Sequence, residues 1–156
     1  MDKELRQEYR EYAWKYFELH ADQRLKAFHF FIIFATLLIG AFATLLQRSG
    51  LQLAYVLLPL SLMFLSFVFW KLEERTRMLV KNGEDALKYL DAEALRSETV
   101  LFQNLALFDA DDRNVEELRN TNLWHDHFSY SRCFRWVYIS AGALGVLGVL
   151  ICFVGT

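Results

Sequence analysis

Three long stretches of this 156-residue chain carry no formal charge, and each has the length of a membrane-spanning helix. A helix needs ~20 apolar residues to cross ~30 Å of hydrocarbon. Within lipid every backbone N–H and C=O group must be paired inside the segment, so each stretch must be helical. The chain is therefore predicted to be an all-α integral membrane protein. The three predicted transmembrane helices cover residues 27–47, 50–70 and 136–155.

The chain is short enough to form one membrane domain, residues 1–156, with alternating polar and apolar parts. The first part has apolar residues at helical spacing, and no Gly or Pro interrupts it before Gly40. We therefore expect one long helix that runs from water into the membrane. Pro59 predicts a kink within the second membrane helix. The four predicted parts are the amphipathic helix 1–26, the transmembrane hairpin 27–70, the helical segment 71–135 and the third span 136–156.

The charges are segregated along the chain, and this predicts its orientation. Sixteen of the 17 Lys and Arg residues and all 19 acidic residues lie in 1–26 and 71–135, and only Arg48 lies between the first two spans. The positive-inside rule then places the N-terminus and 71–135 in the cytoplasm, and the C-terminus on the periplasmic side. The cytoplasmic part has a net charge of −3, which disfavours direct RNA binding. Because a polar segment precedes the first span, we expect no cleavable signal peptide.

The residues from Arg24 to His29 fit the RxxxxH pattern of HEPN ribonucleases, in which an Arg and a His meet across a dimer. The pattern fixes only two residues. The alternative is that Arg24 and Lys26 are anchors at the membrane border. An ionisable group inside a membrane helix usually faces the bundle or a water-filled cavity. His29 is thus a candidate for a subunit contact or a pore lining, or it is a neutral histidine at the membrane interface.

The predicted spans offer few polar groups for a lumen. Candidate lining residues are Thr36, Thr44, Ser61, Ser66 and Tyr138. Small residues at close spacing let membrane helices approach one another, within or between subunits. The third span carries three such glycines, Gly142, Gly145 and Gly148.

Four basic residues follow the second span and predict a contact with anionic lipid headgroups or with a partner. They are Lys71, Arg75, Arg77 and Lys81. The sequence His125-Asp126-His127 contains possible metal ligands, but it lacks the spacing of a zinc site and is read as a solvated turn. Cys133 and Cys152 lie too far apart on one helix to form a disulfide bond. We expect no metal and no cofactor, and we expect that the protein is not an enzyme, with a HEPN-like ribonuclease as the less favoured alternative.

Short motifs resemble those of a family of membrane proteins. They are the entry Trp14-Lys-Tyr-Phe-x-x-His20-Ala-x-Gln-Arg24, the exit Glu74-Arg75 with Arg77-x-Leu79-Val-Lys-x-Gly83-Glu84-x-Ala-Leu87, and the entry Phe128-Ser-Tyr-Ser-x-x-Phe134. The chain resembles the RipA-like octameric membrane proteins, which include the small membrane-pore accessory protein of type VI-B CRISPR systems with its divergent HEPN-like motif. The resemblance implies a ring-shaped homo-octamer with a central pore in the bacterial inner membrane. It also implies antiphage defence, in which the pore depolarises the membrane and enhances an RNA-guided type VI CRISPR ribonuclease.

Two functions are weighed against each other. The first is a homo-oligomeric pore, because a unit of three helices is small to enclose a conduction path alone. The second is a membrane-anchored scaffold or a HEPN-like ribonuclease without a pore. An enzyme with a soluble cofactor is the weakest option, because the polar part has no concentration of catalytic groups.

Overall fold

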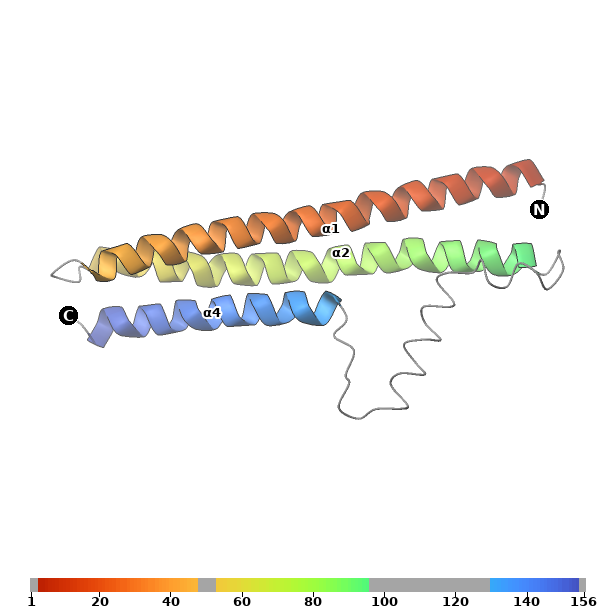
Figure 1. Cartoon of the computed structure of the whole chain (residues 1–156). Coiled ribbons are helices and arrows are strands. Elements are labelled where there is room, and N and C mark those ends of the chain that lie inside the picture. Colours follow the sequence, from red (N-terminus) through yellow and green to blue (C-terminus); the bar gives the residue numbers. More distant parts are fainter. Residues whose placement is uncertain (1–2, 48–52, 96–129, 155–156) are drawn as a thin grey trace, which may run out of the picture. The chain divides into compact units, whose positions relative to one another are not determined.

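The computed structural model describes residues 3–47, 53–95 and 130–154, and every regular element among these residues is helical (Figure 1). The elements are α1 (Lys3–Leu46), a 3₁₀ turn η1 (Leu53–Val56), α2 (Leu57–Leu95) and α4 (Tyr130–Val154). The all-α prediction is confirmed for this part of the chain. The predicted turn at 48–50 and most of the polar segment, residues 96–129, lie outside the described residues.

Helix α1 is one uninterrupted helix of 44 residues. Its first 20 residues alternate charged and aromatic side chains, and its last 20 are almost entirely apolar. No Pro removes a backbone donor, and Gly40 near the end is the only glycine, so nothing in the sequence ends the helix early. The change from a polar to an apolar surface thus takes place along a single helix, as the sequence predicted.

Helix α2 begins at Leu57, and Pro59 is its third residue. The first turn of a helix has free N–H groups in any case, so a proline there removes no hydrogen bond. The predicted kink inside a membrane helix is therefore wrong, because the segment before Pro59 forms η1 and not α-helix. Within the described part of the predicted span 50–70, residues 53–56 form η1 and the α-helix begins at residue 57.

The structure divides into two compact units, and the described residues 3–22 and 76–95 belong to the first. Among its described residues, the two helices bury a small core around Ala13, Leu87 and Leu90, with Phe17 packed against it. Gly83 is buried where a Cβ atom would lie 3.0 Å from Cβ of Phe17, so only glycine permits this approach of α1 and α2. The ion pair Arg10–Asp91, at 3.1 Å, joins the same two helices.

Residues 23–75 and 130–156 form the second unit, which contains the apolar halves of α1 and α2 and all of α4. In this unit α1 and α2 run antiparallel, and α4 runs in the direction of α1 (Figure 1). Phe31 from α1, Leu62 from α2 and Tyr138 from α4 meet in its buried core. The ring of Tyr138 lies edge-on to that of Phe31, with centroids 4.6 Å apart.

Two described helices are long and apolar enough to cross a membrane, namely α1 and the part of α4 from Arg132 to Val154. Only 11% and 28% of their most apolar windows are buried inside the chain, so most of this apolar surface faces outward. A water-soluble protein rarely exposes so large an apolar surface, whereas a lipid-facing helix does so at no cost.

Candidate functional site

A polar and small-residue stripe runs along the outward side of α1 in the second unit. It consists of His29, Thr36, Gly40, Ala43 and Gln47, all of them exposed, and the exposed Ile33 interrupts it between His29 and Thr36. Their spacing of three, four and seven residues places them on one face of a helix. Phe31 and Ala35, which are buried, lie on the other side of α1. A Cβ atom at Gly40 would meet nothing within 4 Å, so the stripe is open within the subunit.

The outward side of α4 has the opposite character. Its exposed residues are large and apolar, with Trp136, Ile139, Leu144, Leu147 and Leu150 each at least half exposed. Such a surface suits lipid chains. A face with His29 and Thr36 does not, because polar side chains inside a membrane seek protein partners or water. The two faces of the unit are therefore chemically distinct, and the α1 stripe is the one that needs water or a neighbouring subunit.

The other polar residues expected at a lumen lie elsewhere. Ser66 and Tyr138 are buried within the subunit, with exposed fractions of 4% and 3%. The Ser66 hydroxyl donates to the carbonyl of Leu62, 2.8 Å away on the same helix. Thr44 donates in the same way to the carbonyl of Ala41 at 2.7 Å. Ser61 is exposed as well, so the structure leaves Thr36 and Ser61 as the exposed candidates whose hydroxyls can still serve a lumen or a neighbour.

Two of the three glycines of α4 are used for packing inside the subunit. A Cβ atom at Gly145 would lie 2.6 Å from Cγ of Met63 and 2.9 Å from the carbonyl oxygen of Pro59. One at Gly148 would lie 2.8 Å from Cβ of Pro59 and 3.2 Å from the ring of Phe42. Gly142 has more room, since its nearest neighbour would be Cβ of Ser66 at 3.7 Å. Gly145 and Gly148 therefore bring α4 onto the first turns of α2, a role that the sequence left open between intrasubunit and intersubunit contacts.

A buried ion pair joins α1 and α2 in the second unit. Nε of Arg24 donates to both carboxylate oxygens of Glu73 at 3.0 Å. The side chains are only 15% and 6% exposed. The Arg24 guanidinium also lies 5.3 Å from the ring centroid of Phe134 on α4, and this ring stacks on Phe28 at 4.0 Å. The pair therefore ties all three helices together at one level.

The sequence drew attention to Arg24 but not to Glu73. The sequence did contain a signal for Glu73. It is an acidic residue one turn after the end of an apolar span, at about the same predicted depth in the membrane as Arg24. Within the chain, Arg24 and His29 are not brought together. They are five positions apart, so they project about 140° apart around α1. Arg24 forms hydrogen bonds with Glu73, whereas His29 is exposed.

The basic residues after the second span are divided between two environments. Lys71 donates to Glu74 at 2.8 Å, and this hydrogen bond, with the charge of Lys71, lowers the pKa of the Glu74 carboxyl. Nζ of Lys71 also lies 5.3 Å from the ring of Trp70. Arg75 and Lys81 are exposed and Arg77 is partly buried. An exposed Lys beside a Trp is typical of a membrane border, so this region remains a candidate for headgroup contact.

No cluster of three His, Cys, Asp or Glu side chains that could hold a metal ion occurs among residues 3–47, 53–95 and 130–154. The sequence His125-Asp126-His127 lies outside the described residues. Cys133 is exposed and Cys152 is buried, and both are free thiols.

Comparison with known proteins identifies the family of this chain. The model of the octameric membrane protein family (8xMP) matches residues 7–154. CD-NTase-associated protein 19 of Escherichia coli is 35% identical over 138 residues, which cover 88% of this chain and 85% of that protein. No solved structure matches the chain. From the family match and the extent of this similarity, the chain belongs to the octameric membrane protein family.

Proposed function

We propose that eight copies of this chain form a ring-shaped pore in a bacterial inner membrane, and that the pore depolarises the membrane in antiphage defence. The observation that carries the proposal is the exposed stripe of His29, Thr36 and Gly40 on a helix apolar enough to span a membrane. Because the family is octameric, we propose that this stripe lies away from lipid, at the axis of the ring.

The size of an α-helix supports an open lumen. If each subunit contributes one α1 helix of about 10 Å diameter to a closed ring of eight, the space inside the ring is on the order of 15 Å wide. That width admits hydrated ions. The outward face of α4, with Leu147 and Leu150, would then lie toward lipid. The predicted span 50–70 and the cytoplasmic N-terminus complete the proposed topology.

The role in defence is supported by the name of the relative, which associates that protein with a CD-NTase. By similarity, we propose that this chain is the membrane effector of a defence system that contains such a partner. A link to an RNA-guided type VI CRISPR ribonuclease follows only from the resemblance of short motifs and stays a prediction.

The test of the pore is current across a planar bilayer that contains the purified octamer. We expect stepwise conductance that scales with the number of inserted particles. An octamer that inserts fully and carries no current at any voltage or pH would contradict the proposal.

A ribonuclease assay on the His29→Ala variant addresses the alternative function. This variant is cleaner than Arg24→Ala, because Arg24 holds Glu73 and its loss would also disturb the fold.

A bulky side chain at Gly40 is expected to block conduction without preventing assembly. Eight indoles at one level would fill the lumen, so Gly40→Trp should lower single-channel current by roughly tenfold. The subunit itself has room for the new side chain, since nothing lies within 4 Å of this position. Size-exclusion chromatography with light scattering checks that the variant is still octameric. If Gly40→Trp instead dissociates the octamer, the stripe is a contact between subunits and not a lumen.

Accessibility to a water-soluble thiol reagent gives a second readout of the same surface. In a Cys133→Ser, Cys152→Ala background, Thr36→Cys should react with a charged methanethiosulfonate and lose current. The matched control is Ile139→Cys, on the exposed side of α4, which should be protected by lipid. Equal reaction at both positions would contradict the assignment of the two faces.

A further inference from the structure

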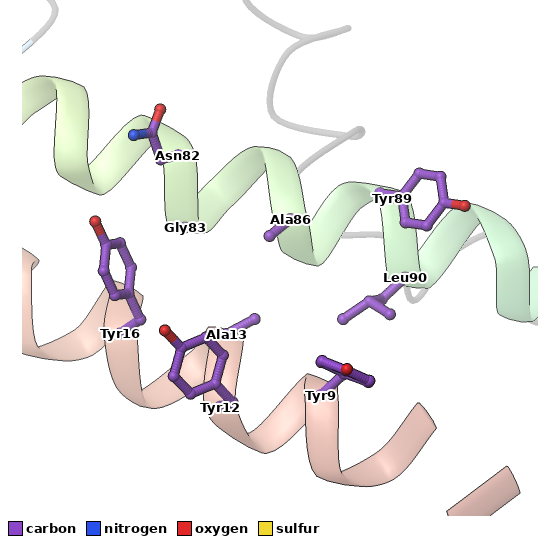
Figure 2. Close-up of a pocket in the computed structure, with 9 residues that line it drawn as sticks. All are labelled: Tyr9, Tyr12, Ala13, Tyr16, Asn82, Gly83, Ala86, Tyr89 and Leu90. Carbon is purple, nitrogen blue, oxygen red and sulfur yellow. The ribbon is translucent and has the colours of Figure 1, made fainter. Parts of the chain in front are cut away.

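The first unit carries an aromatic groove that no function described so far uses. It is ≈ 530 Å³ in volume and lies between α1 and α2 (Figure 2). Tyr9, Tyr12 and Tyr16 from α1 and Tyr89 from α2 line it, over a floor of small residues that includes Gly83 and Ala86. Tyr9 is 53% exposed, Tyr12 68% and Tyr89 70%. The groove is thus largely apolar, aromatic and open.

This groove lies in a strongly charged part of the chain, outside the predicted membrane spans. Nine of the twenty residues from 3 to 22 are charged, four basic and five acidic. In lipid, exposed aromatic rings would be at no disadvantage, but in water they favour burial against a partner. The near balance of charges does not suit the anionic surface of a membrane, which attracts clusters of Lys and Arg. Tyrosine and tryptophan are the residues enriched in contacts between proteins.

The same unit carries a large exposed aromatic residue on its other side. Trp14 is 49% exposed and does not line the groove. It lies two residues from both Tyr12 and Tyr16, so it projects about 160° away from them around α1. Its ring centroid is 5.9 Å from that of Phe17, which packs against Gly83. The unit thus has an aromatic projection on one side and an aromatic groove on the opposite side.

We infer that Trp14 of one copy docks into the tyrosine groove of the next copy around the ring. A cyclic octamer repeats one contact between two different surfaces, and a projection opposite a groove is the arrangement that such a contact requires. Trp14 of one copy and Tyr9, Tyr12 and Tyr89 of the next expose about 400 Å² of side chain between them, roughly a quarter of the ~1,600 Å² that both partners of a specific interface bury in total. The inference depends on the octameric assembly of the family and not on conduction by the proposed pore.

Cysteine pairs across the proposed contact test it directly. In the Cys133→Ser, Cys152→Ala background, Trp14→Cys combined with Ala86→Cys should give a ladder of disulfide-linked oligomers under mild oxidation. Each single substitution should give no ladder. The matched control replaces Ala86→Cys with Lys81→Cys, an exposed position on α2 that does not line the groove. An octamer that forms no ladder, or forms it equally with the control pair, would overturn the inference.

A second measurement, by photo-cross-linking, keeps an aromatic side chain at position 14 in case the cysteine variants do not assemble. Benzoyl-phenylalanine at position 14 should cross-link to peptides that contain Tyr12 or Tyr89 of another copy. Cross-links elsewhere would exclude this groove as the docking site. Trp14→Ala should also raise the concentration at which octamers dissociate by at least about tenfold, because a central Trp is a typical hot spot. The control Trp136→Ala, equally large and exposed on α4, should change it little.

The two proposals fail in distinguishable ways. Cross-linking tests only the contact between Trp14 and the tyrosine groove of the next copy, and bilayer current tests only conduction. A specific ladder from an octamer that carries no current would leave the docking surface standing and remove the pore. Current from an octamer without the ladder would do the reverse.

Discussion

Replacement of Glu73 with alanine is expected to destabilise the subunit by about 3–5 kcal/mol. The carboxylate is 6% exposed and accepts two hydrogen bonds from Nε of Arg24 at 3.0 Å. Its removal leaves the Arg24 guanidinium buried without its charge partner, and an unpaired buried charge costs this much in comparable sites. Thermal unfolding of the detergent-solubilised protein should show the midpoint falling by roughly 10 °C or more.

The double variant Arg24→Met, Glu73→Leu separates the cost of an orphaned charge from the value of the pair. Two apolar side chains of similar size bury no charge, so most of the lost stability should return. A double-mutant cycle compares the unchanged protein, the two single variants and the double variant. The coupling energy between the two side chains should be on the order of 2–3 kcal/mol. Additive losses, with the double variant as unstable as the sum of both single variants, would mean that the two side chains do not stabilise the fold as a pair.

A second large effect is expected at Gly145. In Gly145→Val the new Cβ would lie 2.9 Å from the carbonyl oxygen of Pro59, a backbone atom that cannot rotate away. Helix α4 must then move off α2, at a cost of about 3 kcal/mol for an overpacked site. We expect a lower unfolding midpoint and a loss of octamer in mild detergent, measured by light scattering.

Gly40 provides the matched control for Gly145. Both are glycines inside predicted membrane helices, but a Cβ atom at Gly40 meets nothing within 4 Å. Gly40→Val should therefore leave the unfolding midpoint unchanged or raise it slightly, because glycine is a poor helix former. If both substitutions destabilise equally, the close approach of α4 to Pro59 is not the cause.

The sequence predicted most of the helices because the property that defines them is local. A span of ~20 uncharged residues is visible without any knowledge of its neighbours. The continuity of α1 followed from the lack of Gly and Pro before Gly40. The error at Pro59 came from assuming that the helix had already begun at residue 50, since a proline disrupts a helix interior but not its first turn.

The partners of individual side chains were harder to predict, because they depend on the rotation of each helix about its axis. Arg24 was visible as a membrane-border cation, but its pairing with Glu73 required the register between α1 and α2. Likewise Gly145 and Gly148 indicated close helix packing, but only the structure shows that they pack against Pro59 on α2. His29 and Thr36 were identified as candidate lumen residues, and the structure adds that both share one exposed face.

The contact of Gly145 and Gly148 with Pro59 has a consequence for how such an assembly opens. At this point the backbone of α4 lies directly against the carbonyl oxygen and the ring of Pro59 and against Met63, so these tightly packed atoms resist sliding of one helix along the other. The halves of α2 and α4 that meet there are therefore expected to move as one block. Any opening or closing of the assembly is then left to tilting of α1 or to rotation of entire subunits.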